Sequence, residues 1–67
     1  MIEVSVNGKA RHVGQDTTVA ALLDAMQLTG KRLAVERNGE IVPKSRHGAT
    51  ALLAGDKLEI VVAVGGG

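Results

Sequence analysis

The feature that most constrains the fold is the strand pattern at residues 57–64, close to the end of the chain. One face of this segment is wholly apolar, because the alternate positions hold Leu58, Ile60, Val62 and Val64. Val61 and Ala63 make the second face apolar too, which is typical of a central strand or of a surface that receives a partner. We therefore expect this strand in the middle of a sheet, beside the first strand of the chain.

Two hairpins supply the other strands. The first strand is predicted at residues 2–6, where apolar and polar residues alternate, and Asn7-Gly8 then predicts a two-residue type I′ turn. Both turn residues tolerate the positive φ that this turn requires, so the return strand is expected at residues 9–13. A second Asn-Gly pair predicts another hairpin, with its strands at residues 33–37 and 40–42.

One amphipathic helix is predicted between the hairpins. Its apolar face has helical spacing and consists of Val19, Leu22, Leu23 and Met26. Thr17 or Thr18 precedes this face and can cap the first turn with its hydroxyl, and Gly30 fits the helix exit. The segment at residues 44–54 is expected to be irregular, with a short helical turn near residues 45–47.

This order of elements predicts an α+β protein, with one main helix packed across a mixed sheet of four to five strands. The arrangement is the β-grasp topology. A chain of 67 residues is one domain, in which we expect a folded body at residues 1–64 and a flexible tail at residues 65–67.

The composition excludes several classes of site. The chain has no cysteine, which rules out a disulfide, a thiolate nucleophile, a zinc-thiolate site and a persulfide on this chain. Eight basic and seven acidic residues give a net charge of +1, far from the excess of a nucleic-acid-binding protein. No apolar run approaches the roughly 18 residues of a membrane span, and no basic leader is visible. We therefore expect a soluble cytoplasmic protein without a bound metal or cofactor.

No set of side chains has the pattern of an enzyme active site. His12 and His47 lack partners at metal-ligand spacing, and His47 is expected to be solvated in a polar loop. Ser5 and Ser45 lack the context of a nucleophile, and the carboxylates are scattered singly. The cations between the predicted helix and the last strand are expected to be solvated, with a steering surface for an acidic partner as the alternative. They are Lys31, Arg32, Arg37, Lys44 and Arg46.

The sequence ends on Gly65, Gly66 and Gly67, directly after the strongest strand. Three residues reach at most about 10 Å, and without side chains they can thread a narrow tunnel in another protein. A carboxylate on Gly67 is a poor electrophile until ATP converts it to an acyl-adenylate. A sulfur nucleophile would then leave a thiocarboxylate, whereas an amine or thiol on another protein would give a conjugate. A frayed end or a truncated linker is the alternative.

Short motifs along the whole chain match one known family. They are Val6-Asn7-Gly8, Thr18-Val19, Leu22-Leu23, Ala34-Val35-Glu36, Asn38-Gly39-Glu40-Ile41-Val42-Pro43, Gly55-Asp56 and the final Gly66-Gly67. On these residues the chain resembles the sulfur carriers of thiamine biosynthesis, the ThiS family of the ubiquitin-like β-grasp superfamily. One departure is Gly65, a third glycine ahead of the usual pair, which we expect to loosen the tail without changing its reactive end.

The resemblance implies a mechanism and a set of partners. In that family an E1-like adenylyltransferase (ThiF) activates the last glycine with ATP, a cysteine desulfurase provides the sulfur, and thiazole synthase (ThiG) receives it. Carried over to this chain, Gly67 bears the thiocarboxylate, while Gly65 and Gly66 thread the tunnel. The chain would then be a protein co-substrate rather than an enzyme, with ATP consumed by its activating partner and no cofactor bound.

Two questions stay open at this point. Val61 and Ala63, with Ile41 or Val42 nearby, form either a docking patch for the activating enzyme or an ordinary buried sheet face. The alternatives to a thiamine sulfur carrier are the small subunit of molybdopterin synthase, a ubiquitin-like modifier joined to lysines through Gly67, and an interaction module with a passive tail. The short chain without aromatic residues argues against the molybdopterin synthase subunit.

Overall fold

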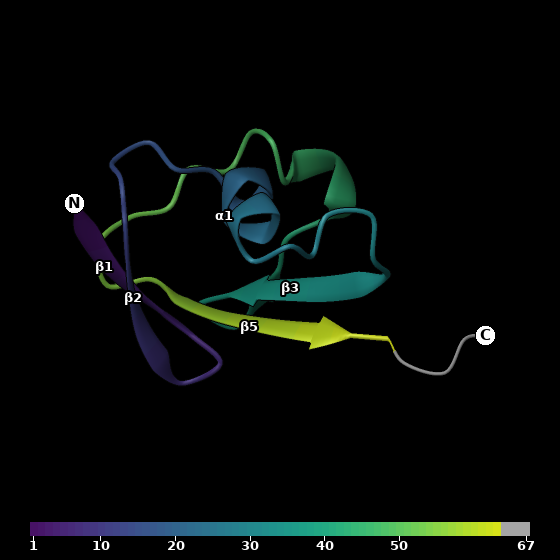
Figure 1. Ribbon diagram of the computed structural model, residues 1–67. Coiled ribbons are helices and arrows are strands. Elements are labelled where there is room, and N and C mark those ends of the chain that lie inside the picture. The colour runs from purple at the N-terminus through teal and green to yellow at the C-terminus, as the bar shows by residue number, and fades with distance from the viewer. Residues whose placement is uncertain (64–67) are drawn as a thin grey trace.

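A mixed sheet with one helix across a single face makes up the part of the chain that the computed structural model describes, residues 1–63 (Figure 1). Within these residues the sheet has five strands in the order β2-β1-β5-β3-β4. The elements are β1 (Ile2–Val6), β2 (Lys9–Val13), α1 (Val19–Ala25), β3 (Leu33–Arg37), β4 (Glu40–Ile41), the 3-10 turn η1 (Lys44–Arg46) and β5 (Lys57–Val62). This is the β-grasp arrangement that the sequence predicts.

The last strand lies in the centre of the sheet, as predicted. It pairs in parallel with β1, where Val6 lies opposite Leu58, and antiparallel with the whole of β3. The strand ends at Val62, opposite Leu33 at the start of β3, rather than at residue 64, and beyond it a single backbone hydrogen bond joins the Ala63 N–H to the Arg32 carbonyl at 2.9 Å. Ala63 follows outside the strand, and the predicted boundary between residues 64 and 65 lies outside the described residues.

Both Asn-Gly turns adopt the predicted conformation and also bind the central strand. Asn7 has a φ of 52° and Gly8 a φ of 84°, as a type I′ turn requires. The Asn7 side chain then pairs with Ile60, accepting from its N–H at 2.8 Å and donating to its carbonyl at 3.1 Å. On the opposite side of β5, the Asn38 side chain accepts from the Lys57 N–H at 2.9 Å. Each side-chain amide thus forms hydrogen bonds to the backbone of β5 at a point where the backbone of its own strand has turned away.

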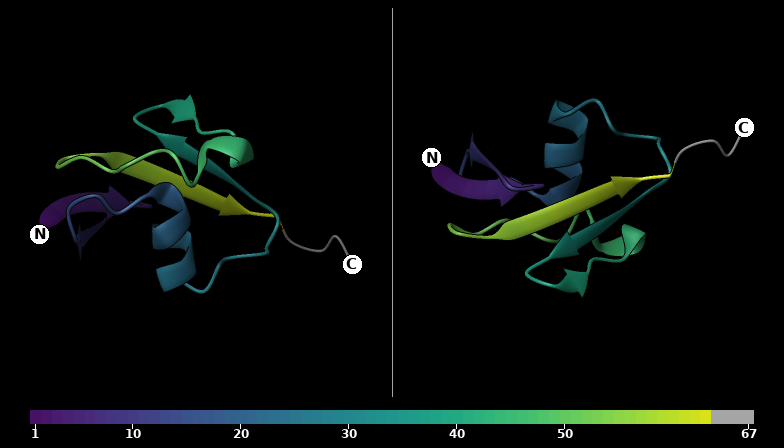
Figure 2. Two further views of the ribbon diagram at one scale, coloured as in Figure 1. Left: turned by 90° about the horizontal axis from the view of Figure 1, so that it is seen from above. Right: turned by 90° about the horizontal axis from the view of Figure 1, so that it is seen from below.

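The core lies between α1 and one face of the sheet. Thr18 caps the helix, its hydroxyl accepting from the Ala21 N–H at 3.1 Å. The buried apolar residues are Val4, Val6, Val13, Val19, Leu22, Leu23, Val35, Leu52, Leu58 and Ile60. Figure 2 shows α1 and η1 on the same side of the strands, and no element of residues 1–63 covers the other side. The molecule therefore has one packed sheet face and one open sheet face.

The end of the helix differs from the prediction at Gly30. The helix ends at Ala25, and Gln27 takes the left-handed conformation with a φ of 60°. The Gln27 N–H donates to the Asp24 carbonyl at 3.0 Å, and the Leu28 N–H donates to the Leu23 carbonyl at 2.8 Å. These two hydrogen bonds form a Schellman motif. Gly30 belongs to the next turn, with a φ of 85°. The prediction of a helix exit at Gly30 was wrong. Glycine is the usual residue in the left-handed position after a helix, but here Gln27 occupies that position.

The second hairpin and the following turn deviate from the predicted bounds by a residue. The strand β4 ends at Ile41, and Val42 instead packs partly buried against the core. The predicted helical turn is present at Lys44–Arg46 and begins after Pro43. Met26, predicted as a core residue, is partly buried at the end of the helix.

Candidate functional site

The point where the chain leaves the sheet is fixed by two strands. Val62 lies opposite Leu33 in the β3–β5 ladder, and the Ala63 N–H donates to the Arg32 carbonyl at 2.9 Å. This end of β5 lies at the opposite end of the molecule from the N-terminus (Figure 1). Gly65, Gly66 and Gly67 lie outside the described residues, so their roles in tunnel threading and as the reactive group stay predictions.

The open face of the sheet carries the candidate docking residues. Val61 is 65% exposed and Ile41 is 61% exposed, which contradicts the alternative that they line a buried sheet face. Ala34 pairs with Val61 across the β3–β5 ladder and is also exposed. Ala63 is exposed just beyond β5, whereas Val42 packs against the core and is not part of this surface. The structure thus places Val61 and Ile41 on the same accessible sheet face, where Ile41 lies opposite Glu36, and the partner of this face stays a prediction.

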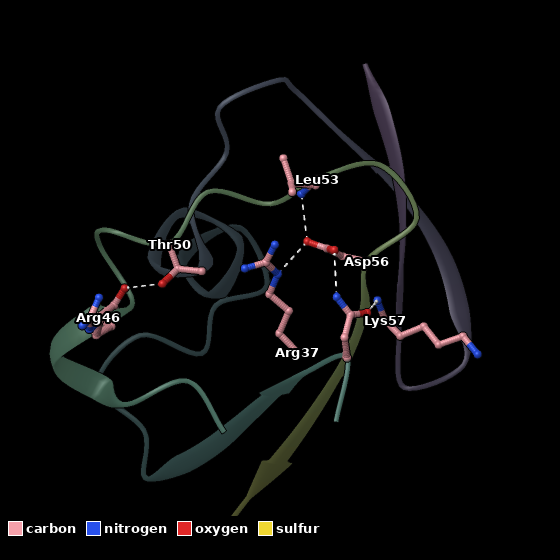
Figure 3. Close-up of polar contacts among 7 residues, drawn as sticks. Arg37, Arg46, Thr50, Leu53, Asp56 and Lys57 are labelled. Atoms are coloured by element: carbon pink, nitrogen blue, oxygen red, sulfur yellow. Dashed lines mark hydrogen bonds and ion pairs between the residues drawn. The ribbon is translucent and has the colours of Figure 1, made fainter. Parts of the chain in front are cut away.

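A buried carboxylate holds the second hairpin to the start of β5 (Figure 3). Asp56 is 5% exposed; its Oδ2 accepts from Arg37 Nε at 2.9 Å and from the Leu53 N–H at 2.8 Å. Its Oδ1 accepts from Asn38 Nδ2 at 3.0 Å. Burial raises the pKa of Asp56, but hydrogen bonds from Leu53, Asn38 and Arg37, with the positive charge of Arg37, outweigh it, so the pKa is lowered. The network joins β3, the turn after it and the loop before β5, so it ties together segments that are distant in the sequence.

Two of the polar residues are less exposed than the sequence predicts. Arg37 was expected to be solvated, but its side chain is 27% exposed because it pairs with Asp56. His47 was also expected to be solvated, yet it is 9% exposed and its Nε2 lies 3.1 Å from the Val42 carbonyl oxygen. Only the fold brings these partners close, and no local sequence signal marks either pair. The other four cations, Lys31, Arg32, Lys44 and Arg46, are exposed as predicted.

Within residues 1–63 there is neither a cluster of metal-ligating side chains nor a long apolar helix. No group of three or more His, Cys, Asp or Glu residues is placed there to hold a metal ion. His12 is exposed, with its Nε2 3.3 Å from Glu3 Oε1 across the first hairpin. No helix in this part of the chain is long and apolar enough to cross a bilayer. Within these residues the distinctive features are the exit of the chain beside β3 and the exposed sheet face that carries Val61.

Comparisons with known proteins agree on one family. The model of the ThiS family matches residues 4–67. The sulfur carrier protein ThiS of Bacillus subtilis is 43% identical over 65 residues, which cover 96% of this chain and 98% of that protein. A crystal structure of the thiamine biosynthesis protein ThiS from Geobacter metallireducens superposes with a TM-score of 0.82 at 32% identity, covering 98% of this chain and 100% of the other.

Two longer proteins are also similar. The thiazole synthase of Paramagnetospirillum magneticum is 46% identical over 66 residues, and that of Magnetococcus marinus is 32% identical over the same length. The matched residues make up 98% of this chain, but the chain spans only 20% of the length of each synthase. The family match over nearly the whole sequence, the close likeness to the Bacillus protein and the fold shared with the Geobacter structure agree, and the chain belongs to the ThiS family.

Proposed function

We propose that this chain is the sulfur carrier for thiazole formation in thiamine biosynthesis, with Gly67 as the residue that bears the sulfur. The observation that carries the proposal is the extent of the family match, which runs through Gly66 and Gly67. The Bacillus subtilis relative, which this chain matches over 98% of that protein's length, is a sulfur carrier protein. The chain is then a co-substrate of other enzymes rather than a catalyst.

The chemistry follows from what Gly67 can and cannot do alone. Attack of its carboxylate on ATP releases pyrophosphate and gives an acyl-adenylate, whose AMP is a good leaving group. The terminal sulfur of a persulfide then displaces AMP and gives an acyl disulfide. A thiol such as cysteine reduces this acyl disulfide, which releases the thiocarboxylate and leaves a second disulfide between the two thiols. The chain has no cysteine, so the sulfur must come from a partner. An adenylyltransferase of the ThiF type would consume the ATP, and a cysteine desulfurase would provide the sulfur. Because the activation needs ATP, we propose a cytoplasmic location.

The folded body would present this reactive end to its partners. Pairing of Val62 with Leu33, and the hydrogen bond from Ala63 to Arg32, define where the following residues begin. Gly65 and Gly66 have no side chains to obstruct a channel, so they would let an enzyme draw Gly67 into its active site. The exposed Val61 and Ile41, with Ala63, would dock the adenylyltransferase. Removing exposed apolar side chains from water lowers the free energy and so favours binding.

Thiazole synthase is the proposed acceptor of the sulfur. The support is that segments similar to this chain occur within two thiazole synthases, of which they form 20% of the length. Joining a carrier and its acceptor in one polypeptide raises their effective concentration for each other. That arrangement is favourable where the two proteins act in one reaction.

Mass spectrometry of the intact chain tests this proposal. The chain is incubated with ATP, cysteine, a cysteine desulfurase and a ThiF-type enzyme that is first shown to activate the Bacillus ThiS protein. Replacement of one oxygen atom by sulfur is expected, and it should be absent without ATP and in a variant that lacks Gly67. Attachment to lysines of another protein would instead identify a modifier. An unchanged mass alongside an active Bacillus control would refute the sulfur-carrier proposal.

A further inference from the structure

A cavity of about 470 Å³ lies beside the point where the chain leaves the sheet. It is a surface hollow open to solvent, lined by the end of α1, the loop into β3 and the η1 turn, and its apolar wall includes Leu23, Leu28 and Leu33. Arg32 also lines it, and the Arg32 carbonyl is the group that accepts the Ala63 N–H. A protein that grips the residues after Ala63 must therefore come close to this cavity.

The rim of the cavity is positively charged. Lys31, Arg32 and Lys44 line it and are exposed, and none of the three is paired with a carboxylate of residues 1–63. No aspartate or glutamate is among the lining residues. The whole chain has a net charge of only +1, so this is a local concentration of positive charge. An apolar hollow with such a rim is complementary to an apolar side chain that is flanked by carboxylates.

The cavity is distinct from the surface that contains Val61 and Ile41. That surface lies on the open face of the sheet, whereas α1 and η1, which contribute residues to the lining of the cavity, lie on the other side (Figures 1 and 2). The chemistry also differs, because the open face places Glu36 opposite Glu59 next to its apolar residues. Two partners that use the same reactive end can therefore recognise the body through different faces.

We propose that this cavity docks thiazole synthase, by receiving an apolar side chain of the synthase that is flanked by aspartate or glutamate residues. The inference rests on the proposed function, since it takes the synthase as the sulfur acceptor. The volume is within the range of pockets that bind small organic groups, so it accommodates a bulky side chain. The cations would speed the encounter, and the apolar wall would slow dissociation.

Binding kinetics with thiazole synthase test the charged rim. The double variant Lys31→Glu/Lys44→Glu is compared with Lys9→Glu/Arg11→Glu, which makes the same change of charge on exposed residues of the edge strand β2. At low salt the rim variant should associate more slowly by on the order of ten-fold, whereas the β2 variant should change by less than about three-fold. High salt should reduce the difference, because it screens exposed charges.

A second variant tests the hollow itself. Gly48 lines the cavity, and a Cβ built there meets nothing within 4 Å and needs no positive φ, so Gly48→Leu should fold normally. Filling the hollow should raise the Kd for the synthase by about ten-fold through faster dissociation, at low and high salt alike. Ala49→Leu is the matched control, because Ala49 is exposed and is not among the lining residues. Circular dichroism confirms that each variant is folded.

The outcomes separate this inference from the proposed function. If the wild-type chain binds the synthase and the rim and Gly48 variants bind as their controls do, the docking site is wrong while the sulfur-carrier function stands. If the same variants weaken only the adenylyltransferase, the assignment of the partner is wrong. If the wild-type chain neither gains sulfur nor binds the synthase, both proposals fail.

Discussion

Replacing Asp56 by asparagine should remove a large part of the stability of this protein. The carboxylate accepts three hydrogen bonds at 2.8–3.0 Å while 5% exposed, and the asparagine amide must present its NH₂ group to at least one of those donors. Hydrogen bonds to a charged group contribute about 1.5–3 kcal/mol each, and the partly exposed Arg37 keeps some hydration after the change. We therefore expect Asp56→Asn to lower the free energy of unfolding by about 2–4 kcal/mol at neutral pH.

That loss is large against the total. A domain of 67 residues has a free energy of unfolding of roughly 3–10 kcal/mol, so the variant should melt about 10–20 °C lower. Far-UV circular dichroism is the appropriate assay, because the chain has no aromatic residue to fluoresce. Asp24→Asn is the control: Asp24 is exposed, and its change should stay within about 0.5 kcal/mol.

The pKa of Asp56 also predicts how its contribution to stability changes with pH. The folded-state pKa of Asp56 is lowered from its ordinary value of 3.8, so the unfolded chain binds its proton more readily. The contribution of Asp56 is then fully present well above pH 3.8 and is lost as the pH falls through the lower folded value. The stability difference between wild type and Asp56→Asn should shrink over that acidic range. Equal stability at neutral pH, or a difference that stays constant on acidification, would refute the reasoning.

Three further changes have distinct expected results. Asn7→Asp places an oxygen where the amide donates to the Ile60 carbonyl, so it should cost about 1–3 kcal/mol in urea unfolding followed by circular dichroism; no loss would show that this pairing is dispensable. Gln27→Gly should instead raise the free energy of unfolding by about 0.5–1 kcal/mol, because glycine adopts the positive φ without strain; a destabilised variant would contradict this. Val61→Asp should leave the melting temperature nearly unchanged but raise the KM of the adenylyltransferase for the chain, while an unchanged KM would exclude Val61 from the docking surface.

The sequence was most informative where structure depends on neighbouring residues. Alternation of apolar residues predicted β1 and the position of β5, and Thr18 marked the start of α1. The turn at Asn7 was predicted from a dipeptide, although its bond to Ile60, which is 53 residues away, was not. Local pattern and propensity therefore specify the elements and the order in which they can pack.

The sequence was least informative where a polar group depends on distant residues. Arg37 and Asp56 are 19 residues apart, and only the packing of β3 beside β5 brings them together. The burial of His47 depends on η1 lying against α1, where the Ala20 N–H donates to the His47 carbonyl at 2.9 Å. The functional role predicted for Gly67 has another origin, because a glycine has no side chain to signal chemistry. It was predicted from the position of three glycines after a strong strand and from the family resemblance.

The central position of β5 has a mechanical consequence. An enzyme that pulls on the chain beyond Ala63 applies tension along the axis of β5, and the hydrogen bonds to β1 and β3 run across that axis. Such bonds are loaded in shear and must yield together, and β5 has them on both sides, whereas an edge strand has them on one side only. The Asn7 side chain adds a cross-link to Ile60 on the same strand. Tension on the residues after Ala63 would therefore be shared between the ladders that join β5 to β1 and to β3.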